Sequence, residues 1–331
     1  MRSYIIRRLI LIVPTVVLVT IIVFGLVRFI PGTVIDLMVA EMAQESGMLD
    51  ELTVQYLMEE LGLDVPVYVQ YGRWVGVLSY PEPKGFDGLL QGSLGDSLWR
   101  RTSITEQIAA RLPVSLELGF FGIITAILIA LPIGIYSAMR QDTAGDYVGR
   151  TIAILAIALP NFWLATMVIV YPSIWWNWTP SMQYIPFVED PIGNLGMFIL
   201  PGIIMGMYMS GNSMRMTRTM MLEVLRQDYI RTAWSKGLPE RTVIMRHAMK
   251  NAMIPVVTLI GQLTTIMIAG SVVLENIFVL PGVGALLIEA LNKRDYPVIS
   301  GINLTLALFV LSINLLIDLT YAWLDPRISY K

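Results

Sequence analysis

Long apolar runs dominate this chain of 331 residues. They cover residues 9–30, 112–139, 151–175, 195–216, 252–274 and 298–323. Each run is long enough to cross about 30 Å of hydrocarbon as an α-helix rising about 1.5 Å per residue. The first run is too long for a signal peptide and is followed by no small-residue cleavage site, so we expect it to be retained. The pattern predicts an all-α membrane protein with six transmembrane helices.

Composition and charge support this class and orient the chain. Hydrophobic residues make up 55% of the sequence and charged residues only 15%, whereas a soluble domain carries about 25% charged residues. Six spans place both termini on one side of the membrane, and that side carries 15 of the 23 Lys and Arg residues. Because basic residues accumulate on the cytoplasmic side, we expect both termini in the cytoplasm.

The segment 31–110 is then an extracytoplasmic region after the first span. Residues 36–64 are rich in acidic side chains and are predicted to be helical, with Leu52, Tyr56, Leu57 and Leu61 spaced for one apolar face. Residues 80–91 contain two prolines and two glycines, which favour an irregular loop. That loop is either a solvated insertion or a contact for a binding protein that delivers substrate.

The most basic part of the chain, residues 228–255, lies between the fourth and fifth spans and is predicted to be cytoplasmic. Apolar side chains at helical spacing precede its glycine: Leu225, Tyr229, Ile230, Ala233 and Trp234. Gly237 favours a helix end, and Pro239 is suited to the first turn of a second helix. We expect a helix, a glycine break and a helix at the membrane surface. By pattern alone, this is also what a basic loop lying on anionic lipid would show.

Motifs in this segment resemble a known loop. Thr232-Ala233-(x)3-Gly237, followed by Arg246-His247-Ala248 and Asn251-Ala252-(x)2-Pro255, is similar to the cytoplasmic coupling loop of ABC-importer permeases. Further matches lie at 61–66 (LGLDVP), 92–97 (GSLGDS), 111–118 (RLPVSLEL) and 158–163 (ALPNFW). The chain thus resembles the B-type subunits of the oligopeptide/dipeptide/nickel permease family over nearly its whole length. It departs from the general importer pattern at Arg231-Thr232-Ala233, where Glu-Ala-Ala is usual.

The resemblance implies a type I ABC importer permease with an extracytoplasmic insertion after the first helix, in a bacterial or archaeal cytoplasmic membrane. The implied domains are the first helix (1–30), the outer region (31–110), a five-helix core (111–323) with its coupling loop (222–251), and a cytoplasmic tail (324–331). The implied partners are a second homologous permease, two ABC ATPase subunits, an extracytoplasmic substrate-binding protein and membrane lipid. The residues expected to couple to the ATPases are Tyr229, Thr232, Ala233, Trp234, Lys236, Gly237 and Leu238. Members of the permease family that the chain resembles carry di- and oligopeptides, nickel complexes, glutathione or some oligosaccharides, and peptides are the favoured cargo.

Polar groups in the spans are candidates for the translocation path or its gate: Asn161, Ser210, Asn212 and Gln262. Pro160, next to Asn161, predicts a kink that either faces the substrate path or serves packing. Gly202, Gly206 and Ser210 form a face of small residues that suits either another helix of this chain or the second permease. Ser210, Gly211 and Asn212 also predict a weak point in that helix. Asp318 in the last span either reaches the interface or takes part in ion coupling.

Several classes of function are disfavoured by the sequence. It has no Gly-x4-Gly-Lys-Ser/Thr loop, so we expect ATP and Mg²⁺ to bind to partner ATPases and no cofactor to bind to this chain. With one histidine, His247, and no cysteine, neither a metal cluster nor a Ser/His/Asp triad is expected. We expect no enzyme activity and no nucleic-acid partner. Two alternatives stay open: a secondary transporter or channel acting alone, although no inverted repeat is evident, and a scaffold or receptor without transport.

Overall fold

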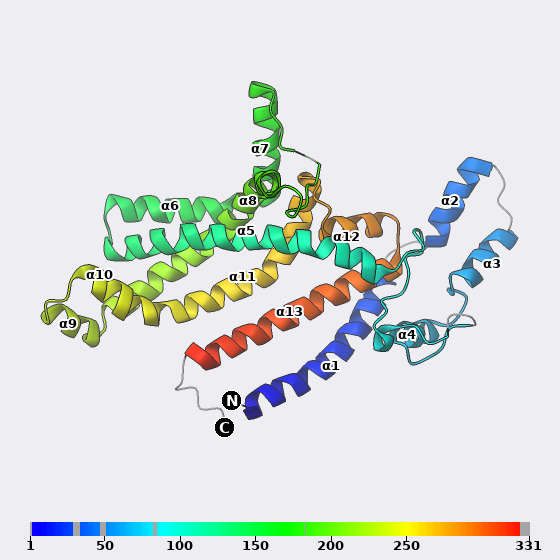
Figure 1. The fold of residues 1–331 in the computed structure, drawn as a ribbon, viewed down its shortest axis with the longest axis horizontal. Helices are drawn as coiled ribbons and strands as arrows, with labels where there is room; N and C mark the ends of the chain where they lie inside the picture. Colours follow the sequence, from blue (N-terminus) through cyan, green and yellow to red (C-terminus); the bar gives the residue numbers. More distant parts are fainter. Residues whose placement is uncertain (1, 29–33, 47–50, 82–84, 182, 325–331) are drawn as a thin grey trace. The chain divides into compact units, whose positions relative to one another are not determined.

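The computed structural model describes residues 2–28, 34–46, 51–81, 85–181 and 183–324 (Figure 1). Within these ranges the chain is helical, and the only β pairing is an isolated bridge between Asp96 and Ser103. The elements in chain order are α1 (Arg2–Val27), α2 (Val34–Ser46), α3 (Glu51–Glu60), α4 (Val67–Val75), η1 (Leu89–Gln91), α5 (Ile104–Met139), α6 (Ala144–Ala158), α7 (Asn161–Trp176), α8 (Pro191–Leu225), α9 (Asp228–Ser235), α10 (Glu240–Thr242), η2 (Val243–Ala248), α11 (Met249–Ile277), α12 (Val283–Asn292) and α13 (Tyr296–Leu324).

The chain divides into two compact units. Residues 114–284 and 312–324 form the first unit, and residues 2–113 and 285–311 form the second. We call the second the outer unit only because it contains the region 31–110 that the sequence predicts to be extracytoplasmic. In the described part of the chain, α1, α5, α8 and α13 are single helices long and apolar enough to cross a membrane. Two bent pairs supply further candidates: α6 with α7, and residues 240–253 with 255–265. If each bent pair is one span, the described part of the chain has six candidate spans, the number predicted, although the second pair begins before the predicted fifth span at 252–274.

The third predicted span, residues 151–175, is not one continuous helix. α6 ends at Ala158, Leu159 is extended, and α7 begins at Asn161 after a bend of 93°. Pro160 has no N–H to donate and its ring excludes the preceding helical turn, so the helix breaks there. The sequence predicted a kink at Pro160, and the structure shows a full break.

Helix α8 is the centre of the first unit and packs closely against its neighbours. A Cβ added to Gly206 would lie 2.4 Å from the Cβ of Thr125 and 2.6 Å from the carbonyl oxygen of Gly122, both on α5. A Cβ on Gly202 would lie 2.5 Å from the Cβ of Phe121. These glycines of the small-residue face therefore serve contact with another helix of this chain.

The predicted weak point in this helix is not a break. Helix α8 runs without interruption through Ser210, Gly211 and Asn212. A Cβ on Gly211 would lie 2.7 Å from the carbonyl oxygen of Ala153 and 2.6 Å from Ile157. Gly211 is thus needed for the close approach of α6, and Figure 1 shows α5 and α6 running side by side.

The outer unit has its own apolar clusters. Val34, Ile35 and Leu57 are buried together, with Leu61 packed against them. The predicted helices in 36–64 are confirmed as α2 and α3. The prediction that Tyr56 shares the buried face of Leu57 is wrong, because 64% of Tyr56 is exposed. The described residues of the predicted irregular loop form no helix before η1, and residues 82–84 of that loop lie outside the described part of the chain.

Replacing Gly206 by Ala is expected to destabilise the first unit, because the new methyl group would collide with α5. The expected loss in the free energy of unfolding is about 1–3 kcal/mol, the usual cost of overpacking. Chemical unfolding of the purified protein in detergent measures it. Gly196→Ala on the same helix is the matched control, since a Cβ there meets nothing within 4 Å. Equal stability of the two variants would contradict the close packing described for Gly206.

Candidate coupling hairpin

A short helix, α9, follows the end of α8. We call residues 227–251, which lie between α8 and the main part of α11, the α9 hairpin. Asp228 occupies the first turn of α9, where the helix dipole favours a negative charge. Arg231 Nη1 lies 3.5 Å from Asp228 Oδ1, but both side chains are exposed, so this ion pair adds little stability. An isolated helix of eight residues is marginal in water, so α9 must be held by packing.

One side of α9 supplies that packing. Ile230 is fully buried and Ala233 is 6% exposed. They belong to a cluster, which we call the hairpin core, that draws on α5, α8, η2 and α11. Its other buried members are Ala138, Met221, Val243, Ile244, Ala248 and Ala252. The hairpin core therefore joins α9 to the ends of three long helices.

The turn after α9 depends on Gly237. Its φ is +74°, a left-handed conformation that glycine adopts without strain, and its N–H donates to the carbonyl oxygen of Trp234 at 2.9 Å. Pro239 precedes α10 as its N-cap, one position earlier than the predicted first turn. Helix, glycine break and helix thus follow in the predicted order. The sequence did not predict that η2 is a π-helix, a wider turn frequent at functional sites.

The other side of α9 is open. Tyr229 and Trp234 are each 43% exposed, and Thr232, Lys236 and Gly237 are exposed as well. The Tyr229 hydroxyl accepts a hydrogen bond from Asn251 Nδ2 at 2.8 Å, which ties α9 to α11. Leu238 is half-buried against the hairpin core. Of the predicted coupling residues, Ala233 and Leu238 thus face the protein, and the others form a surface of two aromatic rings, a hydroxyl and a cation.

A buried charge cluster lies beside this hairpin in the first unit, and sequence reasoning missed it. Asp146, at the start of α6, is fully buried. Arg218 on α8 donates to it from Nε and Nη2, both at 2.8 Å. Arg150 Nη2 at 3.1 Å and the backbone N–H of Asp142 at 3.0 Å complete its partners. The bidentate geometry is the strong form of this contact. Asp146 and Arg218 are 72 positions apart in the sequence, so no local pattern could have predicted their pairing.

The predicted path residues lie on three different helices. Asn161 is half-buried in the first turn of α7, and Gln262 is exposed on α11. On α8, the buried Ser210 hydroxyl donates to the Met207 carbonyl oxygen at 2.7 Å, and Asn212 Oδ1 accepts from Arg215 Nη2 at 3.0 Å. No hydrogen bond joins one of these side chains to another in the described part of the chain. Their role in a translocation path stays a prediction.

Multiple apolar spans define a multi-pass membrane protein, and its hairpin is packed against the protein on one side and open on the other. Comparison with known proteins gives its family. Residues 130–330 match the family described as "Binding-protein-dependent transport system inner membrane component", and residues 1–119 match the N-terminal region of such membrane components. The chain belongs to this family and is a permease subunit of the inner membrane.

Two relatives match this chain over their full length. The dipeptide transport system permease protein DppB of Escherichia coli (strain K12) is 37% identical over 354 residues, with 100% of both chains covered. The protein of the same name from Alkalihalophilus pseudofirmus is 37% identical over 357 residues, again with 100% of both covered. A crystal structure of an amino acid ABC transporter with histidines is similar at a TM-score of 0.49 and 14% identity, over 65% of this chain and 93% of that one.

Replacing Asp146 by Asn is expected to destabilise the first unit by about 3–5 kcal/mol, because Arg218 then loses the carboxylate that compensates its charge. Asp142→Asn is the matched control. Its side chain is 64% exposed and lies 3.6 Å from Arg150, so a change of about 0–1 kcal/mol is expected. Denaturant unfolding of both variants in detergent measures the difference. A loss no larger at Asp146 than at Asp142 would contradict the assigned role of the buried cluster.

Proposed function

We propose that this chain is a permease subunit of an ATP-driven peptide importer and that the α9 hairpin couples it to ATPase subunits. The observation that carries the proposal is the division of α9 into two sides. Ile230 and Ala233 fix it to the ends of the spanning helices, while Tyr229 and Trp234 remain exposed. Exposed aromatic residues beside cations are typical of the centres of protein interfaces. A partner that grips this side would move α9.

The physical basis of the coupling is rigidity. Met221 of α8 and Ala252 of α11 both contact the hairpin core. A force on α9 is therefore passed to the two helices that carry Asn212 and Gln262. Close-packed interiors transmit such displacements because they cannot be compressed. In this proposal the ATPases bind ATP and Mg²⁺ and carry out hydrolysis, and this chain has no catalytic role of its own.

Peptides are the proposed cargo. Support comes from the full-length similarity to permeases named for dipeptide transport. A second homologous permease would complete the translocation path, and an extracytoplasmic binding protein would deliver the peptide, in keeping with the description of the family as binding-protein-dependent. Nickel complexes and oligosaccharides are the alternative cargoes. Uptake of one of these, without uptake of peptides, by the reconstituted complex would overturn this part of the proposal.

Replacing Trp234 by Ala is expected to lower ATP-dependent dipeptide uptake about tenfold or more, because truncation of an aromatic residue at an interface centre costs about 2 kcal/mol or more. Uptake into proteoliposomes that contain the complete importer measures it, with the amount of assembled complex determined in parallel. Trp178→Ala is the matched control, since Trp178 is also half-exposed but lies outside the hairpin. Undiminished uptake in the Trp234 variant would contradict the coupling proposal.

The proposed orientation places the α9 hairpin in the cytoplasm and the loop before α8 outside. Since the natural sequence has no cysteine, single cysteines report position directly. Ser235→Cys is expected to react with a membrane-impermeant maleimide only after the cells are opened, whereas Ser181→Cys is expected to react in intact spheroplasts. Both positions are exposed, so labelling depends only on which side of the membrane each cysteine faces. The opposite pattern of labelling would show that the chain has the reverse orientation in the membrane.

A further inference from the structure

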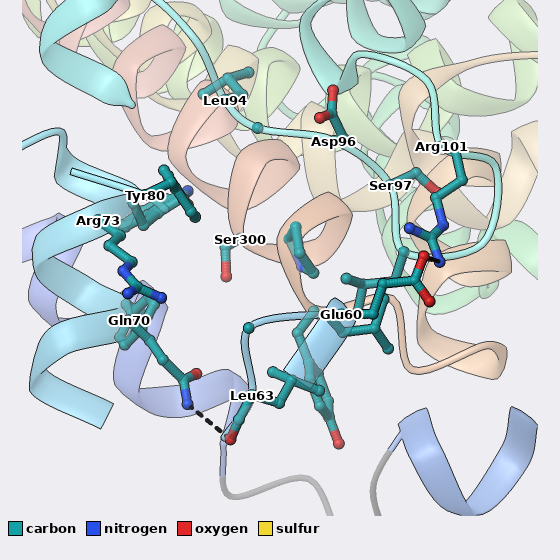
Figure 2. A pocket seen from close by; sticks show the side chains of 18 of the residues that line it. Glu60, Leu63, Gln70, Arg73, Tyr80, Leu94, Asp96, Ser97, Arg101 and Ser300 are labelled. Atoms are coloured by element: carbon teal, nitrogen blue, oxygen red, sulfur yellow. Dashed lines mark hydrogen bonds and ion pairs between the residues drawn. The ribbon is translucent and has the colours of Figure 1, made fainter. Parts of the chain in front are cut away.

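The outer unit contains a cavity that no step of the proposed coupling uses. Its volume is about 390 Å³, within the range of about 300–1,000 Å³ typical of small-molecule sites. Figure 2 shows side chains from distant parts of the sequence that converge on it, with Gln70 and Arg73 facing Glu60 and Arg101 across the opening and Ser300 between them. All of these residues belong to the outer unit.

The walls of the cavity combine charge with aromatic surface. Three arginines (Arg28, Arg73 and Arg101) and two acids (Glu60 and Asp96) line it. Two of these arginines have polar partners. Arg101 Nη2 lies 3.2 Å from Glu60 Oε1, and Arg28 donates to Gln70 Oε1 while its guanidinium lies 3.8 Å from the centre of the Phe24 ring.

Arg73 differs from the other two arginines. Its Nε is buried and has no acceptor, and no carboxylate pairs with its guanidinium among the described residues. The guanidinium instead lies 5.6 Å from the centre of the Tyr80 ring. Trp74 also lines the cavity and is 6% exposed. Its indole N–H has no acceptor among the described residues either. Buried donors without partners are rare in folded proteins, so each one calls for an explanation.

An unpaired guanidinium with its rigid fork of donors suits a planar carboxylate. Next to Arg73, the rings of Phe24 and Trp74 are stacked at 5.5 Å and supply an apolar surface. The facing wall holds Glu60 and Asp96 against one arginine, Arg101, which pairs with Glu60, so this wall carries one net negative charge. A molecule that matches these three surfaces has a carboxylate at one end, an apolar side chain next to it and an ammonium group at the other end.

We propose that this cavity binds a short peptide or amino acid through its free α-carboxylate, which Arg73 holds, with the adjoining side chain against Phe24 and Trp74. This inference rests on the proposed function for its choice of peptides, but it concerns a site separate from the α9 hairpin. The outer unit would then hold cargo or sense it.

The test uses the full chain in lipid nanodiscs, without partners, and the dipeptide alanyl-phenylalanine as the probe. Titration calorimetry is expected to show saturable binding. The same dipeptide with its carboxylate converted to an amide is expected to bind about tenfold more weakly or worse, because the charge-assisted contact to Arg73 is lost. Free phenylalanine is titrated in parallel and separates an amino acid site from a dipeptide site by its relative affinity.

Two variants test whether the binding is in this cavity. Arg73→Gln is expected to lose about tenfold or more in affinity for the dipeptide. Arg100→Gln is the matched control, because Arg100 lies in the same unit, pairs with Glu289 at 2.7 Å and does not line the cavity. Its affinity is expected to equal that of the natural protein. Equal binding of acid and amide, undiminished binding by the Arg73 variant, or absence of saturable binding would each overturn the proposal.

Failure of this site is distinguishable from failure of the proposed function. If the complete importer takes up the dipeptide but the chain shows no carboxylate-dependent binding, only the cavity proposal falls. If the importer carries no peptide while the chain binds the dipeptide through Arg73, the cargo is wrong and the site stands.

Discussion

Burial of one side of α9 is the interaction on which the proposed coupling depends. An isolated helix of eight residues is not stable in water, because its few hydrogen bonds do not offset the unfavourable free energy of nucleation. Complete burial of Ile230 contributes about 1.5–3 kcal/mol, and Ala233 extends the same contact. Without these contacts α9 would be a loose loop on lipid, which is the alternative that its basic, amphipathic sequence had left open. With them, its position is tied to α5, α8 and α11.

Helix α8 extends this constraint through the first unit. At one end, Met221 lies in the hairpin core. One turn earlier, Arg218 holds the buried carboxylate of Asp146 on α6. Further along the same helix, Gly211 permits the approach of α6 and Gly206 the approach of α5. In the proposed coupling, a displacement of α9 would act on these close contacts and on the bidentate ion pair.

Much of this arrangement could be predicted from the sequence, because it is encoded locally. Apolar runs of sufficient length gave the spans, and Gly237 gave the end of α9. Tyr56 shows where local pattern fails: its spacing fitted the buried face, but the neighbouring elements cover Leu57 instead. Pro160 was expected to kink a span, yet whether a proline bends or breaks a helix depends on what surrounds it.

Features that depend on residues far apart in the chain escaped prediction altogether. The pairing of Asp146 with Arg218 joins α6 and α8, which are separated in the chain by α7 and the segment that follows it. The cavity beside Arg73 draws on the ends of α1 and α13, which no spacing rule brings together. The sequence pattern also did not distinguish Trp234 from Ala233. Only the packing of α9 shows that Ala233 is buried and Trp234 is exposed. These are the features on which the functional proposals rest.

The central claim is that the open side of α9 is held by a separate ATPase, and site-directed cross-linking tests it most directly. Thr232→Cys places a reactive group on that side, in a chain that otherwise has no cysteine. In the purified complex carrying a benzophenone probe at this position, we expect a cross-link to the nucleotide-hydrolysing subunit, identified by mass spectrometry. Cross-links to lipid alone, with that subunit present in the complex, would contradict the account.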